Sequence, residues 1–351
     1  MARRDRSTEI EAALLKAVAD HPRDLVGVVA AQLGLSRQRI AMQVRALVAA
    51  DYLRKQGSTR PTYALGRNRR FERRFPRAEL TEDVVWFGHV LPLLGELPRN
   101  VIDIAQHGLT EIVNNAIDHS DAAHVRVRVD VRDGRLQLEV ADDGIGIFCK
   151  IARALALPDE RLALLELSKG KFTTDPRRHT GEGVFFTSRM FDNFRIVSGS
   201  LVFDHDTDLA DILIDDDGTP ERGTTVLMAI RTNATRTARE VFEAYSSGPD
   251  DYSFAKTVVP VRLAQVGDEN LISRSQAKRL LQRVDRFRHV VLDFSNVHSI
   301  GQAFADEIFR VFTNAHPEVE LVPMHAAPDV QQMIRRAELA RDQGDDQLPL
   351  I

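Results

Sequence analysis

The chain has 351 residues, of which 43% are hydrophobic and 28% charged, a composition typical of a folded protein with two or three domains. No apolar run approaches the length of a transmembrane helix, and the N-terminus lacks the apolar core of a secretory signal. The single cysteine, Cys149, excludes an intramolecular disulfide, so we expect a cytoplasmic protein that does not engage a membrane.

Charge is unevenly distributed along the chain. Residues 1–80 contain 17 Lys/Arg and 8 Asp/Glu, a net charge of +9, whereas the remainder carries −13. A basic N-terminal region on an acidic body indicates that only this region meets a polyanion such as DNA. The alternative is a charge asymmetry that serves solubility.

The first 66 residues predict three helices and a hairpin. Apolar residues at helical spacing indicate helices over 8–20 and from Asp24 to Gly34, and Ser36 is placed to cap a third. Two short strand-like runs follow around Gly57. This order resembles the winged helix-turn-helix DNA-binding modules, so we assign residues 1–68 to such a domain and residues 69–80 to a basic linker.

The resemblance implies a DNA-binding surface on this first domain. In a helix-turn-helix the start of the second helix of the motif faces base edges, while a wing contacts phosphates. The residues concerned are Ser36, Arg37, Gln38, Arg39 and Gln43 on the helix and Arg54, Lys55 and Arg60 on the wing. The alternative is a module for protein contact whose arginines are solvated. The linker either touches phosphates as well or is merely solvated.

A second domain is predicted over residues 81–232. A helix is expected over 99–119, followed by a hairpin over 124–144 that turns at Asp133-Gly134. A long lid-like stretch comes next. An α+β sandwich is completed by a helix over 183–192 and by strands over 194–204, 209–215 and 224–231.

A third domain is predicted over residues 250–345, after a polar, turn-rich break over 232–254. A buried strand from Val290 to Phe294 precedes a helix over 302–313, and a second strand and helix follow. Alternation of strand and helix is typical of a small α/β layer fold.

The helix over 99–119 carries polar side chains close together. At 100° per residue they share one side of the helix, and the apolar residues lie opposite. The polar side consists of Glu111, Asn114, Asn115 and Asp118. A solvated face alone would explain this arrangement, so the interpretation depends on the motifs that follow.

Three short motifs follow the helix in a fixed order. The hairpin ends in D-x-G-x-G, and a G-x-G stands just before the helix over 183–192, where backbone amides favour phosphate. Two threonines then begin the last strand. The residues are Asp142, Gly144 and Gly146, then Gly181 and Gly183, then Thr224 and Thr225. Each motif alone is a weak signal. The polar helix followed by the three motifs in this order is a strong signal.

Over about residues 100–231, this order resembles the nucleotide-binding fold of the gyrase, heat-shock chaperone, histidine-kinase and mismatch-repair ATPases, the GHKL superfamily. The similarity is greatest to the anti-sigma-factor and histidine-kinase branch. It implies a two-layer, Bergerat-type ATP-binding sandwich in which Asn115 holds Mg²⁺ through its side-chain oxygen. It also implies that Asp142 accepts the adenine amino group, assisted through a water by Thr225 or Thr224.

The resemblance assigns further roles around the nucleotide. The glycines of the first motif let the base lie against the backbone, and those of the second cradle phosphates. Glu111, one helical turn before Asn115, matches the general base of hydrolysing and phosphotransferring members. The alternative is a helix-surface glutamate without a catalytic role. Lys169, Lys171 and His179 reach the phosphates from the lid, or are solvated lid residues.

The segment VVLDFSNVHSIGQAFADEIF resembles the STAS-like domains, relatives of anti-anti-sigma factors. In that family a serine at the start of the helix accepts phosphate from a GHKL kinase. Ala303 stands where that serine is expected, and Ser299 lies in the preceding loop. This departure argues against an internal kinase–substrate relay, and the module would instead dock on the ATPase domain or on a partner.

The expected protein is a multidomain transcriptional regulator that binds ATP and Mg²⁺ and whose affinity for DNA depends on nucleotide. Glu111 makes slow ATP hydrolysis compatible with this reading. The alternative is a protein serine/threonine kinase of the anti-sigma-factor type that acts on a separate STAS-domain partner. His89 and His107 are interpreted as structural. The sequence leaves open whether the chain is a monomer or a homodimer.

Overall fold

The computed structural model describes residues 2–172, 181–206, 212–215, 221–248, 251–265 and 269–345. The chain divides into two compact units, Met1–Asp143 with Thr225–Thr235 and Gly144–Thr224 with Arg236–Ile351. These units cut across the domains predicted from the sequence. The first holds the N-terminal module and part of the ATPase-like region, and the second holds the rest of that region and the C-terminal α/β region.

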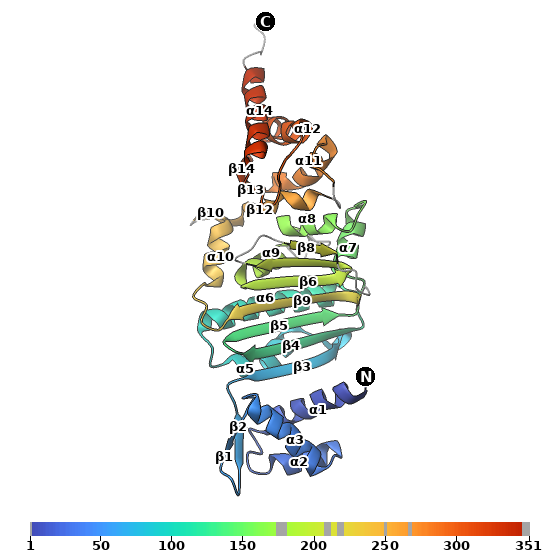
Figure 1. The fold of residues 1–351 in the computed structure, drawn as a ribbon, viewed down its shortest axis with the longest axis vertical. Coiled ribbons are helices and arrows are strands. Elements are labelled where there is room, and N and C mark those ends of the chain that lie inside the picture. Colours follow the sequence, from blue (N-terminus) through green and yellow to red (C-terminus); the bar gives the residue numbers. More distant parts are fainter. Residues whose placement is uncertain are drawn as a thin grey trace. The chain divides into compact units, whose positions relative to one another are not determined.

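The N-terminal module contains three helices and a two-stranded hairpin (Figure 1). Gly34 ends the second helix, and Ser36 caps the third by accepting a hydrogen bond from the Arg39 amide at 3.3 Å, so both predicted boundaries are confirmed. The arrangement is consistent with the predicted winged helix-turn-helix. The elements are α1 Ala2–Ala17, α2 Leu25–Leu33, α3 Arg37–Ala49, β1 Leu53–Gln56 and β2 Thr62–Leu65.

A four-stranded antiparallel arrangement in the order β3-β4-β5-β9 completes the first unit. Its first strand corrects a prediction, because residues 69–76 are not a linker but pair with β4 from Arg69 to Pro76. The four arginines made this strand look like a basic linker in the sequence. Phe71 and Phe75 nevertheless lie on its core-facing side, opposite Val129 and Val125. The strands are β3 Arg69–Pro76, β4 His124–Arg132, β5 Arg135–Asp142 and β9 Glu221–Arg231.

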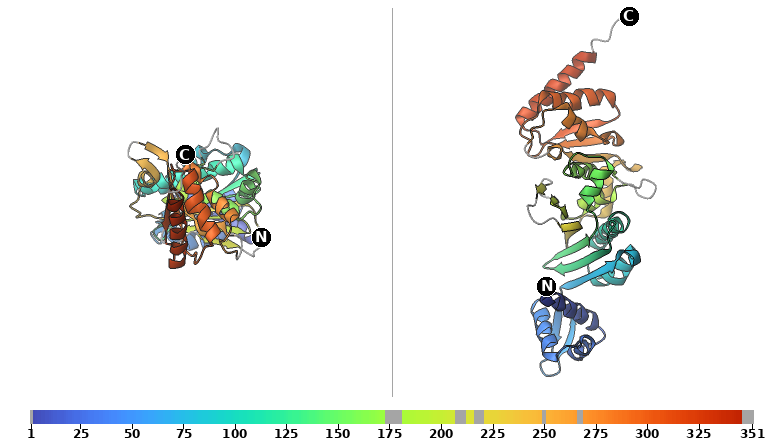
Figure 2. Two further views of the ribbon diagram at one scale, coloured as in Figure 1. Left: turned by 90° about the horizontal axis from the view of Figure 1, so that it is seen from above. Right: turned by 90° about the vertical axis from the view of Figure 1, so that its right-hand side faces the viewer.

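Helix α6 (Arg99–His119) packs across one face of β4 and β5 (Figures 1 and 2). Its apolar side, including Ile112 and Val113, meets the buried valines and leucines of these strands, which alternate with polar residues on the other face. Short helical segments lead into α6. They are Arg77–Glu79, α4 Glu82–Val85, Trp86–Val90 and α5 Leu91–Leu94.

A buried polar network anchors the N-terminal module on this sheet. The Tyr52 hydroxyl donates to Asp130 Oδ1 of β4 at 3.1 Å, and Arg70 Nη2 of β3 donates to Asp130 Oδ2 at 2.8 Å. Arg70 Nη1 also meets Glu11 Oε1 of α1 at 3.4 Å. Tyr52 is 3% and Asp130 6% exposed, so this charge cluster is largely withdrawn from water. Burial is the main cause of the raised pKa of Glu11.

The second unit begins with helices that occupy the predicted lid. The single strand expected over 194–204 is two strands, because the chain turns at Gly199 and Ser198 pairs with Leu201. The predicted strand over 209–215 is described only from Ile212. The elements are α7 Ile147–Ala154, α8 Leu162–Lys169, α9 Gly183–Met190, β6 Asn193–Gly199, β7 Leu201–Asp206 and β8 Ile212–Asp215.

The C-terminal α/β region has three parallel strands in the order β12-β13-β14, with helices around them (Figure 1). Its predicted alternation of strand and helix is confirmed. The segment predicted as a break instead contains helix α10, which starts with a capping box of Thr237 and Glu240, and a short hairpin. The elements before the sheet are α10 Ala238–Tyr245, β10 Ser246–Gly248 and β11 Asp251–Phe254.

The helices of this region flank its sheet. The predicted helix over 302–313 runs as consecutive α and π segments from Gln302 to Ala315. The elements are β12 Lys256–Pro260, Val261–Ala264, α11 Arg274–Leu281, Val284–Arg286, β13 His289–Asp293, α12 Gln302–Asp306, Glu307–Phe312, α13 Thr313–Ala315, β14 Glu320–Met324 and α14 Pro328–Asp345. Within the described ranges, no helix has the length and apolar character needed to cross a membrane.

Candidate functional site

Helix α6 presents Glu111 and Asn115 one turn apart on one side. Both are half-buried, whereas Ile112, Val113 and Ala116 between and beside them are buried. The predicted division of the helix into a polar and an apolar side is therefore confirmed. On one helix face, a carboxylate can act as a general base and an amide oxygen can bind a hard cation.

The hairpin that ends in the first glycine motif supplies two adjacent aspartates with different surroundings. Asp143 Oδ1 accepts hydrogen bonds from the amides of Ala123 and His124 at 2.8 and 2.9 Å, and Arg74 donates to Asp143 Oδ2 at 2.9 Å. These bonds, led by that of the His124 amide, lower the pKa of Asp143 to about 2. Asp143 therefore fixes the start of β4, and Asp142, the last residue of β5, is the one predicted to accept adenine.

The register of β5 and β9 separates the two threonines. Thr225 pairs with Ala141, whereas Val140 and Val226 form a buried pair on the opposite face of the sheet. Side chains alternate along a strand, so Asp142 shares the face of Val140 and not the face of Thr225. The register thus argues against Thr225 as the assistant of Asp142.

Thr224 instead holds the first glycine motif in place within the second unit. Its Oγ1 accepts a hydrogen bond at 2.9 Å from the amide of Ile147, the first residue of α7. Gly146 just before it has φ +87°, and a Cβ there would approach Ser198 Oγ to 2.6 Å. Ser198 in turn donates to the Gly223 carbonyl at 2.9 Å. Only glycine fits this packed turn.

The second glycine motif stands at the start of α9, as predicted. The helix begins at Gly183, and the Gly181 carbonyl accepts a hydrogen bond from the Phe172 amide at 3.2 Å. Glu182 occupies the cap position, and burial, partly offset by nearby Lys171, raises the pKa of its carboxyl. Helix N-terminal amides at this position suit a phosphate. His179 lies outside the described residues.

The surroundings of Lys169 differ from the predicted ones. Its ammonium is buried and pairs with Glu166 Oε1 at 2.6 Å. Burial lowers its pKa to about 8, against the opposing effect of Glu166. The Lys171 ammonium, predicted to reach phosphates, donates to the Arg286 carbonyl at 2.9 Å and lies over the Phe287 ring. In this structure both lysines are engaged by the C-terminal α/β region because their lid segment packs against it.

Cys149 lies on α7 next to the first glycine motif. Burial, followed by the nearby carboxyl of Glu160, raises the pKa of its thiol. A thiol with a raised pKa is a poor nucleophile at neutral pH. This environment suits a structural role for Cys149.

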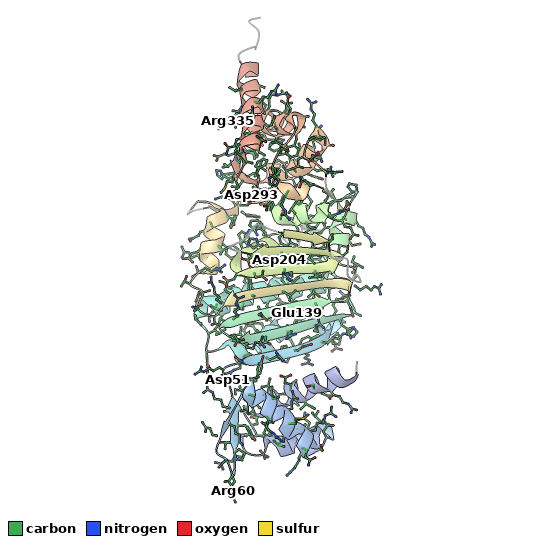
Figure 3. The ribbon with its side chains drawn as sticks, viewed as in Figure 1. Asp51, Arg60, Glu139, Asp204, Asp293 and Arg335 are labelled. Carbon is green, nitrogen blue, oxygen red and sulfur yellow. The ribbon has the colours of Figure 1, made fainter. Side chains whose placement is uncertain are left out.

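The predicted DNA-contacting residues lie around α3 and the hairpin. Most of them are exposed, and Arg60 marks the far end of the hairpin (Figure 3). Arg54 and Lys55 are adjacent in β1, so they point to opposite faces of the hairpin. Gln43 is half-buried and accepts a hydrogen bond from Ser7 of α1 at 3.4 Å, which holds its amide against that helix.

Comparison with known families assigns two regions of the chain. Residues 100–233 match the histidine kinase-, DNA gyrase B- and HSP90-like ATPases. That stretch is a GHKL-type ATPase domain. Residues 276–331 match the STAS-like domain of unknown function (DUF4325). No curated protein matches the chain.

The chemistry of the ATPase domain's residues can be compared with what Mg²⁺ and ATP would need. The amides at the start of α9 suit a phosphate, and Gly146 is required by the packing of its turn against Ser198 and Gly223. Asn115 supplies one oxygen ligand of the kind that Mg²⁺ takes alongside phosphate and water oxygens. The residues present therefore fit Mg²⁺ and ATP.

Several residues in these surroundings were not anticipated from the sequence. Ser198 supports the glycine turn, yet it sits in an ordinary strand sequence with no local signal. Glu166 could have been noticed, because a charge among the leucines of LALLELSK needs a partner when that helix is buried. Its second partner, Arg283, lies 117 residues away and only the fold brings it there.

Proposed function

We propose that this protein is a regulator that binds ATP with Mg²⁺ through its ATPase domain and that nucleotide binding changes its affinity for DNA. In this proposal Asn115 is the Mg²⁺ ligand and Asp142 the acceptor for the adenine amino group. Bound Mg²⁺ would neutralise phosphate charge. Glu111 would orient and deprotonate a water for slow hydrolysis. The match of residues 100–233, which encloses all three residues, is the observation that carries the proposal.

The buried network around Asp130 supports a connection between nucleotide and DNA. Asp130 lies on β4, which pairs along its length with β5, the strand that ends at Asp142. Tyr52 of the N-terminal module donates to Asp130, and Arg70 of β3 pairs with both Asp130 and Glu11 of the module. A shift of these strands on nucleotide binding would therefore move the proposed DNA-binding module with them.

Calorimetric titration with MgATP tests the nucleotide assignment. We expect Asp142→Asn to weaken binding strongly, because the amide presents one acceptor oxygen in place of two and lacks the charge that strengthens the hydrogen bond from the adenine amino group. We expect Asn115→Ala to remove the Mg²⁺-dependent part of the affinity and to leave weak binding of metal-free ATP. Asp143→Asn is the matched control for the neighbouring carboxylate. Unchanged affinity in both Asp142→Asn and Asn115→Ala would contradict the proposal.

A second candidate is a protein kinase that acts on a separate STAS-domain protein. Glu111, placed one turn before Asn115, favours it because a base at this position serves a hydroxyl acceptor as well as water. Stable transfer of label from ATP to a partner side chain would favour the kinase, and release of inorganic phosphate alone would favour the regulator.

A further inference from the structure

A lysine in the lid is a buried cap on a helix of the C-terminal α/β region. The lid residues 162–172, here called the latch segment, end helix α8 at Lys169. The three donors of the Lys169 ammonium go to Glu166 Oε1 at 2.6 Å, the Gln282 carbonyl at 2.9 Å and the Arg279 carbonyl at 3.2 Å. These carbonyls terminate α11, where the helix dipole favours a cation.

Glu166 completes a buried ion triad with a residue of the STAS-like domain. Its Oε1 serves Lys169, and its Oε2 accepts a hydrogen bond from Arg283 Nη1 at 2.9 Å. Glu166 and Lys169 are 2% and 0% exposed, and Arg283 is largely buried too. Arg283 also donates to the Lys171 carbonyl. A buried charge is costly unless every partner is in place, so this triad specifies one arrangement of the two segments.

The backbone of the latch segment is fitted to the same neighbour. The Lys169 carbonyl accepts a hydrogen bond at 2.7 Å from Thr257 Oγ1, which is buried in β12. At Gly170 an added Cβ would lie 2.7 Å from the Phe254 ring. Phe254 packs against Phe185, Phe186 and Phe287. The contact therefore combines ion pairing, backbone hydrogen bonds and an aromatic cluster within the second unit.

We propose that this contact is an autoinhibitory latch, in which the STAS-like domain holds Lys169 away from the phosphates of ATP. The proposal rests on the proposed function, because it takes ATP as the ligand and Lys169 as a phosphate contact. An ammonium has three donors, and all three are used in the latch, so a phosphate can gain Lys169 only if the latch opens. Nucleotide and the STAS-like domain then compete for one side chain.

The latch predicts the direction in which a mutation changes the affinity for nucleotide. Weakening the STAS side of the latch lowers the cost of releasing Lys169, so it strengthens nucleotide binding. Arg283→Gln removes the charge that pairs with Glu166 and leaves Lys169 itself intact. We expect it to bind MgATP about fivefold tighter or more than the wild type, a coupling of ordinary allosteric size. The matched control is Lys278→Gln on the preceding helix α11, whose ammonium faces Glu307 of its own domain at 3.8 Å.

Calorimetry of the full chain separates the outcomes. If neither the wild type nor folded Arg283→Gln binds MgATP, the proposed function fails and the latch fails with it. If the wild type binds but folded Arg283→Gln binds equally or more weakly, only the latch is overturned. Tighter binding by Lys278→Gln as well would also overturn it, because the effect would then reflect loss of positive charge in general.

Hydrogen exchange on the wild type covers the case in which Arg283→Gln does not fold. We expect saturating MgATP to increase amide exchange in residues 162–172 and in 276–288, the two sides of the latch, because nucleotide opens it. Unchanged or slowed exchange on both sides would overturn the proposal. Helix α14 of the C-terminal α/β region, away from the triad, provides the internal reference.

Discussion

At the scale of single residues, neighbouring side chains of one type have different surroundings. Asp143 is fixed by backbone amides, whereas Asp142 is the residue proposed to read adenine. The sequence motif could indicate that an aspartate mattered, and its spacing to the glycines selected Asp142. It could not show that Thr225 lies on the opposite face, because that follows from the register with β5.

His107 gives a residue-scale prediction about pH. It lies one turn before Glu111 on α6, and burial lowers its pKa. The unfolded chain then binds the proton more readily, so the stabilising contribution is present above pH about 6.5 and is lost as pH falls below it. We expect the urea-unfolding free energy of the wild type to fall more between pH 7.5 and 5.5 than that of His107→Gln. Parallel pH profiles would contradict this.

At the scale of elements, helices with clear amphipathic patterns were predictable and the partners of buried charges were not. The boundaries of α2 and α3 follow from local capping chemistry at Gly34 and Ser36. Strand β3 was missed because its arginines gave it the composition of a linker, although its two phenylalanines lie on one face of the strand. The lysines of the lid were expected at phosphates, and no local pattern reveals that the end of α11 offers its carbonyls to Lys169.

The anchoring of the N-terminal module gives an element-scale prediction. Tyr52→Phe removes one hydrogen bond to the buried carboxylate of Asp130 while keeping the ring. We expect a loss of about 1.5–3 kcal/mol in unfolding free energy, the range for hydrogen bonds to charged groups. Tyr63→Phe in the same hairpin is the control, because its hydroxyl makes no hydrogen bond within the described part of the chain. Equal stability of the two variants would contradict the assigned role of the network.

At the scale of the whole molecule, regulated DNA binding is the property to measure. We expect MgATP to change the affinity of the full chain for mixed genomic fragments. We also expect Arg60→Gln to reduce the slope of log affinity against log salt by about 1, as for one phosphate contact. Fluorescence anisotropy at several salt concentrations gives both quantities. Arg335→Gln, on α14 of the C-terminal α/β region, removes the same charge elsewhere (Figure 3).

Two results of that titration would count against regulated DNA binding. Absence of binding at low salt would remove DNA as the partner. Binding that MgATP leaves unchanged, in a protein shown to bind MgATP, would separate the N-terminal module from the nucleotide. An equal change of slope in Arg335→Gln would show that the proposed wing contact is not specific.

The pairing of β3 with β4 determines where the chain can be truncated to give a stable fragment. The region that matches the ATPase family starts at residue 100, well after β3 ends at Pro76. A fragment trimmed to that match would expose the backbone amides and carbonyls of β4 that pair with β3. Such an open edge recruits strands from other molecules, so the fragment would tend to aggregate. A fragment beginning before Arg69 would keep the edge covered by the chain's own strand.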